Sequence, residues 1–134
     1  MSFPALVGRS SHWRAYKILY KITDVKPLAF CGSALADLKR FPEKTRNEAG
    51  RQLRRVQHGL DPHNWKSMNP VGPGVREIRI RDEHGAFRVL YVASIRNAIH
   101  VLHCFKKKTE KTAFTDLSLA RQRYRAALIQ ESEP

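Results

Sequence analysis

The stretch from Gly74 to Ala93, which reads GVREIRIRDEHGAFRVLYVA, restricts the fold more than any other part of the sequence. Apolar and other residues alternate through it, and a period of two is typical of a strand with one buried side. The segment DEHG in its middle has the composition of a tight turn. The sequence therefore predicts a β-hairpin, with arginines at positions where sheets commonly carry apolar side chains.

Further strands and one loop follow from similar patterns. The predicted strands are residues 25–30, 75–81, 86–94 and 98–106. An Ile-Arg-Asn turn joins the last two strands. Residues 61–74 are dense in proline, glycine and asparagine, so we expect a loop there. Trp65 and Met68 are expected to hold that loop against the body of the protein.

Three segments have the apolar spacing of helices that bury one side. They are residues 33–41, residues 42–58 and a segment that begins at Thr115. Ser33 is suited to cap the first helix, and Pro42 to stand in the first turn of the second, where its missing N–H is not needed. Gly59 is suited to end the second helix. The stripes expected to be buried are Leu35, Leu38 and Phe41; Ala49, Leu53, Val56 and Leu60; and Leu117, Ala120, Tyr124 and Leu128.

The order β-α-α-β-β-β-α predicts an α+β domain. We expect the helical pair and the C-terminal helix to pack on one face of a small antiparallel sheet. The chain has 134 residues, which suits one domain, and we place that domain at residues 24–130. Residues 1–23 contain no acidic residue and lack the apolar region of a secretory signal, so we interpret them as an N-terminal extension, with a transit peptide as the alternative.

Pairing the strands separates the charged residues from the core. A tight turn at residues 96–97 places Arg88 opposite Phe105. A two- or four-residue turn in the first hairpin brings Arg88 to the side of Glu77, whereas a three-residue turn would reverse this. We prefer the first arrangement because it makes one continuous apolar face. The residues of that face are Ile78, Ile80, Phe87, Val89, Tyr91, Leu102 and Cys104.

The opposite face is expected to gather charged groups. Its residues are Glu77, Arg79, Arg81, Arg88, His103 and Lys107, above Leu90, Val92 and Val101. Like charges at this spacing repel one another, so the arrangement is costly unless an anion binds there. The alternative is a solvated face whose charges prevent association between sheets. That alternative suits Arg88 least, because a central strand rarely carries a charge.

The net charge indicates the class of partner. Lysine and arginine total 25 against 12 acidic residues, which gives +13. Such an excess favours a polyanion, and we expect nucleic acid rather than a membrane surface, because no basic amphipathic helix with a bulky aromatic side is present. Cys31 and Cys104 lack the spacing of a zinc site, so we expect two reduced thiols, no metal or cofactor, and a cytoplasmic location.

One reaction suits these residue types without a metal ion. In RNA a 2′-hydroxyl can attack the adjacent phosphate and expel the 5′-oxygen of the next nucleotide, which needs a base, an acid and cations. Glu77 or His103 could move the protons, and Arg79, Arg88 and Lys107 could hold the phosphate. A salt bridge of Glu77 and an interior position of His103 are the structural alternatives. Additional RNA contacts are expected at Arg81, Lys66, Lys106, Lys108 and Lys111.

Three segments in combination resemble a known family. They are WKSM followed by VGPGVREIRIRDEHGAFRVLYVA, then VLHCFKKKTEKT, and finally ARQRYRAAL. Together they resemble the HigB-like, phage-related branch of the RelE/ParE toxin superfamily, over about residues 25–128. The resemblance implies a compact α+β fold, a toxin of a type II toxin–antitoxin pair, and ribosome-dependent cleavage of mRNA. It also implies a cognate antitoxin, which we expect to be of the helix-turn-helix type.

The resemblance also assigns residues. The basic strand position of the family falls on Arg79, the arginine of its aromatic-arginine motif on Arg88, and its basic residue after the last strand within 106–108. Glu77 stands where related toxins often have a lysine, and Phe114 stands where they have an aromatic residue that can act as an acid. These two departures leave the acid and the base unassigned between Glu77 and His103.

Two other functions fit the same sequence. Some proteins of this superfamily inhibit DNA gyrase with the same fold, so the chain could be a non-catalytic gyrase inhibitor. A basic module that only binds nucleic acid is the third interpretation.

Overall fold

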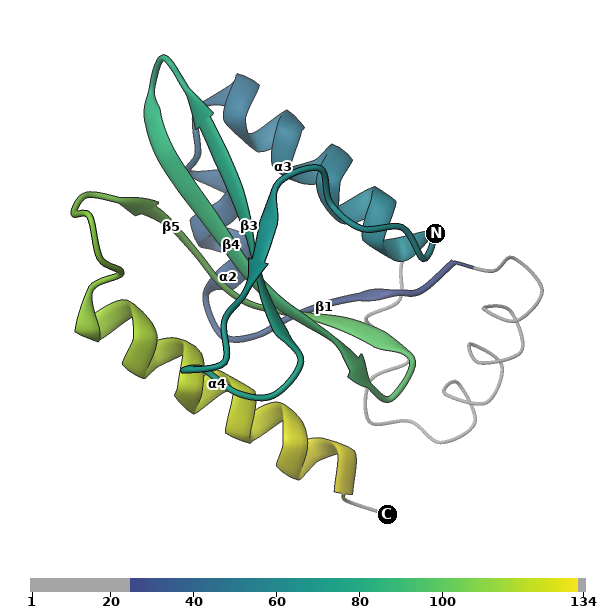
Figure 1. Cartoon of the computed structure of the whole chain (residues 1–134). Helices are drawn as coiled ribbons and strands as arrows, with labels where there is room; N and C mark the ends of the chain where they lie inside the picture. Colours follow the sequence, from purple (N-terminus) through teal and green to yellow (C-terminus); the bar gives the residue numbers. More distant parts are fainter. Residues whose placement is uncertain (1–24, 133–134) are drawn as a thin grey trace.

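The computed structural model describes residues 25–132 (Figure 1). The expected N-terminal extension, residues 1–23, lies outside the described residues. The elements in chain order are β1 (Leu28–Phe30), α2 (Ala34–Lys39), α3 (Glu43–Gln57), β2 (Trp65–Ser67), β3 (Val75–Asp82), β4 (Gly85–Ile95), β5 (Ala98–Lys107) and α4 (Phe114–Ser132). Every predicted helix and strand is present, and the α+β class is confirmed.

The strands form one five-stranded mixed sheet in the order β1-β5-β4-β3-β2. The expectation of a purely antiparallel sheet was wrong, because β1 pairs with β5 in the parallel direction. The expectation that residues 61–74 form only a loop was also wrong, because β2 pairs antiparallel with β3. Both short strands have three residues. A run of that length is too short to show a period, so its pairing comes from the neighbouring strand.

The two hairpins have the predicted register. Asp82 lies opposite Gly85, so the first turn has two residues, and Arg79 consequently lies opposite Arg88. In the second hairpin Arg96 and Asn97 have φ angles of 51° and 55°. Two successive left-handed residues are the signature of a type I′ turn, which matches the twist of the strands that it joins. Glu77, Arg79, Arg81 and Arg88 therefore share one face of β3 and β4.

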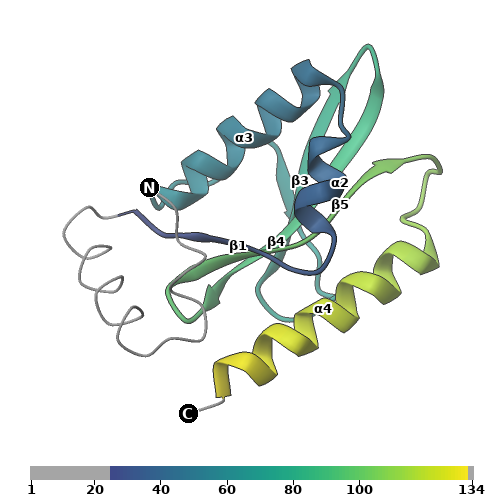
Figure 2. The same ribbon diagram turned by 180° about the vertical axis from the view of Figure 1, so that it is seen from behind.

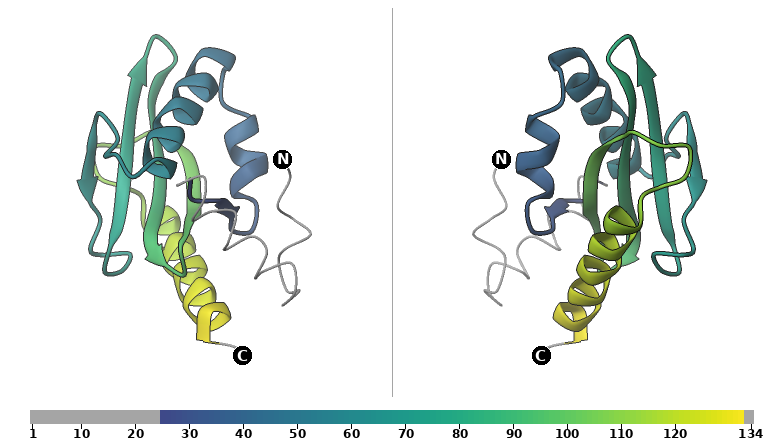
Figure 3. Two further views of the ribbon diagram at one scale, coloured as in Figure 1. Left: turned by 90° about the vertical axis from the view of Figure 1, so that its right-hand side faces the viewer. Right: turned by 90° about the vertical axis from the view of Figure 1, so that its left-hand side faces the viewer.

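The helices lie on both faces of the sheet, which contradicts the expectation that all of them pack on one face. The α2 and α3 helices cover the face of Ile78, Val89 and Tyr91. The left view of Figure 3 shows both helices standing on one side of the sheet. The α4 helix packs instead against the face of Leu90 and Phe105. Its apolar stripe indicates only that one side is buried, and says nothing about which face of the sheet receives it.

The helical stripes are correct in their centres and wrong at their ends. Leu53 of α3 is 1% exposed, whereas Leu60, the last residue of the predicted stripe, is 52% exposed. In α4 Tyr124 is buried, but Leu128 is exposed and Ala127 takes the inner position. Leu60 lies beyond Gly59, whose φ of 82° ends the helical period there.

Because β5 contains a β-bulge, two of its side chains lie on the faces opposite to those predicted. His103 lies opposite Leu90 as expected, but the next pair is Tyr91 with Val101, so Leu102 is an extra residue. One extra residue turns the side chains beyond it to the other face, up to the second register shift between Val92 and Ile95. Val101 therefore packs under α2 and α3, and Leu102 under α4, which is the reverse of the prediction.

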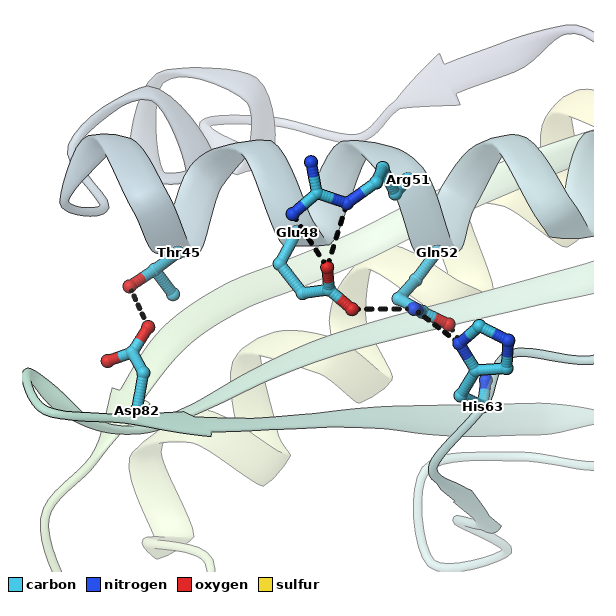
Figure 4. A network of polar contacts seen from close by, with 6 residues as sticks. All are labelled: Thr45, Glu48, Arg51, Gln52, His63 and Asp82. Carbon is cyan, nitrogen blue, oxygen red and sulfur yellow. Dashed lines mark hydrogen bonds and ion pairs between the residues drawn. The ribbon is translucent and has the colours of Figure 1, made fainter.

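Polar contacts fix the ends of the helices. Thr45 donates a 2.6 Å hydrogen bond to Asp82, so the start of α3 is tied to the end of β3 (Figure 4). The Ser33 hydroxyl stands at the N-cap position of α2, but it donates to the Asp37 carboxylate instead of accepting a backbone N–H. Pro42 is the N-cap of α3 and not a residue of its first turn.

Among the helices of residues 25–132, none is long and apolar enough to cross a membrane.

Candidate functional site

On one face of the sheet, charged residues lie in three rows across the strands. Lys66, Glu77, Leu90 and His103 form the first row, Arg79, Arg88 and Phe105 the second, and Arg81, Ala86 and Lys107 the third. All of them belong to the face that α4 contacts, where α4 shares one buried cluster with Val75, Val92 and Ile95 and also with Leu90 and Phe105 of the first two rows. We call Lys66, Glu77, Arg79, Arg81, Arg88 and Lys107 the basic face.

The centre of the basic face is a buried ion pair. The Nε atom of Arg88 lies 3.6 Å from Oε1 of Glu77, and the two side chains are 8% and 2% exposed. One guanidinium nitrogen of Arg88 donates to the carbonyl oxygen of Phe87 at 3.1 Å. Arg88 Nε and Glu77 Oε2 are both buried and make no hydrogen bond within the described residues. Two such groups without hydrogen bonds are expensive to bury, which points to a role other than stability.

The electrostatic environment of Arg88 favours a bound anion. Burial lowers the pKa of Arg88, the carboxylate of Glu77 raises it, and the guanidinium groups of Arg79 and Arg81 lower it further. The charge on Arg88 is therefore only partly compensated by Glu77. An anion placed between these three arginines would relieve the repulsion among them.

Three cations of the basic face are directly available to a ligand. Lys66, Arg79 and Arg81 are exposed, and within residues 25–132 their side chains form no ion pair. Arg79 lies directly opposite the buried Arg88, so the exposed and the buried guanidinium groups are cross-strand neighbours. Two adjacent guanidinium forks on a flat surface are suited to hold one phosphate group from two directions.

His103 lies on the same face of the sheet as Glu77 and contacts the first turn of α4. Its Nε2 atom is 2.7 Å from Oδ1 of Asp116, and its ring stacks on Phe105 with centroids 4.8 Å apart. The contact with a carboxylate places the ring proton on Nε2. The other nitrogen, Nδ1, is buried and has no hydrogen-bond partner in the described part of the chain. The geometry gives His103 the role of joining α4 to the sheet.

The basic run that begins at the end of β5 divides between the two faces. Lys107 shares the basic face, and its ammonium group donates to the carbonyl oxygen of Glu110. Lys106 points to the opposite face, where its Nζ atom lies 5.8 Å from the centre of the Phe87 ring. Lys106 therefore lies on the other face from Lys66 and Arg81, although it lines one hollow together with Lys108. Lys108 and Lys111 are exposed in the segment between β5 and α4.

A hollow lies at the end of β5. Its volume is about 780 Å³, and its lining residues come from both faces of the sheet, among them Phe87, Lys106, Lys107 and Asp116. Within the described chain, Lys107 is the one residue of the basic face that lines it. The side chain of Asp116 is 27% exposed. No group of three histidine, cysteine or acidic residues suited to a metal ion occurs among residues 25–132.

Sequence reasoning did not find Asp116 or the role of Phe105. Asp116 stands in the first turn of the predicted C-terminal helix, where an acidic residue is ordinary because of the helix dipole. Its pairing with His103 depends on α4 crossing the charged end of the sheet, and the helix was expected on the other face. Phe114, whose place in the family pattern was noted, is 74% exposed at the start of α4.

One comparison with known proteins gave a match. The family model described as phage derived protein Gp49-like (DUF891) matches residues 36–125. This range includes β3, β4 and β5 and all residues of the basic face. No curated protein matches the chain.

Proposed function

Because the chain belongs to the Gp49-like family of phage-derived proteins, which is of the RelE toxin type, we propose that it is a ribosome-dependent mRNA endoribonuclease. The family is associated with toxins of toxin–antitoxin pairs. We further propose that the chain belongs to the HigB-like branch and cleaves RNA in the cytoplasm. A cognate antitoxin of the helix-turn-helix type would neutralise it.

The observation that carries the proposal is the second row of the basic face. The exposed Arg79 and the buried Arg88 are cross-strand neighbours, and Arg81 adds a third guanidinium group close to Arg88. A protein gains nothing in stability from three neighbouring like charges. They are suited to the extra negative charge that a phosphate acquires during attack by a hydroxyl group.

The rows also suggest where the protons move. Glu77 lies in the row on one side of the arginines and Lys107 in the row on the other side, each about 6–7 Å away along the strand direction. Attack and departure occur on opposite sides of a phosphate, so a base and an acid are needed on opposite sides too. In the proposed reaction Glu77 takes the proton of the 2′-hydroxyl, and Lys107 gives a proton to the departing 5′-oxygen.

The burial of Glu77 sets an order of events. Its carboxylate is 2% exposed and lies against Arg88, so it meets the RNA only after Arg88 turns toward the phosphate. The 2′-oxygen then forms a bond to phosphorus while the bond from phosphorus to the 5′-oxygen breaks. The products are a 2′,3′-cyclic phosphate and a free 5′-hydroxyl. His103 acts as a positioning residue that holds Asp116 and the start of α4 beside the site.

The test is induced expression of the protein in bacteria, followed by mapping of mRNA 5′ ends. Wild-type protein is expected to stop growth and to produce new ends within translated regions. Arg79→Ala is expected to reduce cleavage about 10²–10³-fold, because one cation at the reacting phosphate is lost. Lys106→Ala is the matched control, since it removes a cation from β5 on the opposite face. Intact transcripts with gyrase-dependent DNA breaks would contradict the proposal and favour the gyrase inhibitor.

A further inference from the structure

A second cationic surface lies on the far side of the molecule from the basic face. The α3 helix covers the other face of the sheet, and in Figure 2 it is seen running across that face. It carries five cationic residues, which are Lys44, Arg46, Arg51, Arg54 and Arg55. Asn47, Arg51, Arg54 and His58 are exposed and recur at spacings of four, three and four, so they form one outward stripe.

A glycine in the middle of this surface has no structural reason within the described chain. Gly50 is exposed in the interior of α3, and a Cβ atom placed there would meet no atom within 4 Å. Glycine disfavours a helix relative to alanine, so this position weakens α3 without relieving any crowding. Arg46 and Arg54 lie one turn before and one turn after it. The missing side chain leaves a gap in which the backbone of a partner could approach the helix closely.

The same surface contains a hollow beside the arginines. Its volume is about 390 Å³, and it is lined by residues of α3 and of the segment that follows, among them Arg51, Arg54, Arg55 and His63. Leu60, which is 52% exposed, forms part of its lining. Aliphatic stems of arginine and an imidazole ring make a surface on which a flat, unstacked base can lie.

The hollow is held in shape by hydrogen bonds (Figure 4). Gln52 is 4% exposed, and its Oε1 atom accepts the backbone N–H of His63 at 2.8 Å. Its Nε2 atom donates to Glu48 at 2.7 Å and lies 3.1 Å from Nδ1 of His63. Arg51 contacts the same Glu48 carboxylate at 2.9 Å. The segment after α3 is thus fixed to the helix before any partner arrives, which reduces the entropy cost of binding.

We propose that the outward surface of α3, centred on Gly50 and Arg54, docks on the phosphate backbone of structured RNA, which in the proposed function is ribosomal RNA. This inference rests on the proposed function, because it assigns the ribosome a contact surface separate from the site of cleavage. RNA is favoured over an acidic protein because four of the five cations are arginines, whose forks fit phosphate groups. Arg51 and Arg54, about 5–6 Å apart on the outward stripe, also suit neighbouring charges of one RNA strand.

The experiment measures binding to purified 70S ribosomes and to a short RNA duplex at several salt concentrations. Arg54→Glu is expected to weaken ribosome binding at least about tenfold and to lower the salt dependence of duplex binding by about one unit of slope. Arg125→Glu is the matched control, since it makes the same change of charge at an exposed position of α4, and it should alter binding less than about twofold.

A second variant separates docking from folding. Gly50→Gln is expected to raise the melting temperature, because glutamine favours a helix, and at the same time to weaken ribosome binding by filling the gap. Wild-type ribosome binding by Arg54→Glu and Gly50→Gln would overturn the inference. Loss of binding to a purified antitoxin, with ribosome binding unchanged, would assign the surface to an acidic protein instead and would overturn it as well.

The outcomes for docking and for cleavage are distinguishable. If wild-type protein binds ribosomes through α3 but leaves mRNA intact, the proposed cleavage fails and the docking surface stands. If Arg54→Glu cleaves mRNA at ribosome concentrations near the wild-type requirement, docking at α3 fails and the proposed cleavage stands. If Arg54→Glu needs a higher ribosome concentration than the wild type but cleaves mRNA at the wild-type rate once ribosomes are saturating, both the docking surface and the proposed cleavage are supported.

Discussion

Replacement of Glu77 and Arg88 by methionine, singly and together, examines whether the buried ion pair serves stability or function. Their side chains are 2% and 8% exposed, and their nearest charged atoms are 3.6 Å apart. Glu77→Met alone leaves a buried guanidinium group beside two other arginines, so we expect a loss of about 3–5 kcal/mol. For a chain of this length that loss lowers the melting temperature by roughly 10–20 °C.

The double variant is expected to behave differently from the sum of the single variants. Removing both charges also removes the two buried atoms without hydrogen bonds, Arg88 Nε and Glu77 Oε2. The double variant should therefore lie within about 1 kcal/mol of the wild type, or above it, while mRNA cleavage is lost. Chemical denaturation gives the four free energies of unfolding, and the cycle yields a coupling energy of about 3 kcal/mol or more. A coupling energy below about 0.5 kcal/mol would refute the interpretation of the two residues as one buried unit.

Three further predictions concern the scaffold. Leu53→Ala, at a side chain 1% exposed, should reduce the free energy of unfolding by about 2–5 kcal/mol in urea, and an unchanged value would contradict the packing of α3 on the sheet. The hydrogen bond from Thr45 lowers the pKa of Asp82 below its ordinary 3.8. The ionised Asp82 therefore stabilises the fold fully above pH 3.8, and this contribution is lost as the pH falls through the lowered pKa. In thermal melts, Asp82→Asn should show a smaller fall of the melting temperature at low pH than the wild type does. Identical profiles of melting temperature against pH would refute the role of Asp82. Burial raises the pKa of Cys104 to about 12 and also raises that of Cys31, so iodoacetamide near pH 8 should label neither quickly until urea is added, whereas fast labelling of Cys104 in the native protein would be contradictory.

The central hairpins could be predicted from the sequence because their signals are local. Alternation along β3 and β4 and the short turns between the strands determined the register of Arg79 and Arg88. Both are consequences of backbone geometry within a few residues. Where the period was interrupted by one residue, at Leu102, the prediction of faces failed, because nothing in the apolar run VLHCF indicates a bulge.

The arrangement of α4 and the composition of the site could not be predicted in the same way. An apolar stripe on α4 shows that the helix is buried on one side, but both faces of the sheet offer apolar surface. Because α4 was expected on the other face, its first turn was not brought near His103, and Asp116 was missed. Lys106, by contrast, lies on the opposite face from its neighbour Lys107 because successive side chains of a strand alternate between the two faces of the sheet.

The arrangement of the basic face suits function better than stability. Exposed Arg79 and Arg81 beside a buried Arg88–Glu77 pair are a costly arrangement for a free protein and a useful one for a phosphate group in reaction. Lys66, Arg79 and Arg81 are exposed, so each can be replaced by alanine without creating a cavity in the core. Loss of activity in such variants is therefore separable from loss of the fold.

The most direct measurement uses purified protein and ribosomes carrying an mRNA with a single 2′-deoxynucleotide at the mapped cleavage position. The account predicts that unmodified mRNA is cut to a 2′,3′-cyclic phosphate and a 5′-hydroxyl, that the 2′-deoxy mRNA stays intact, and that Arg79→Ala cuts the unmodified mRNA about 10²–10³-fold more slowly. Cleavage of the 2′-deoxy mRNA at the same position, or an intact unmodified mRNA on ribosomes, would contradict it.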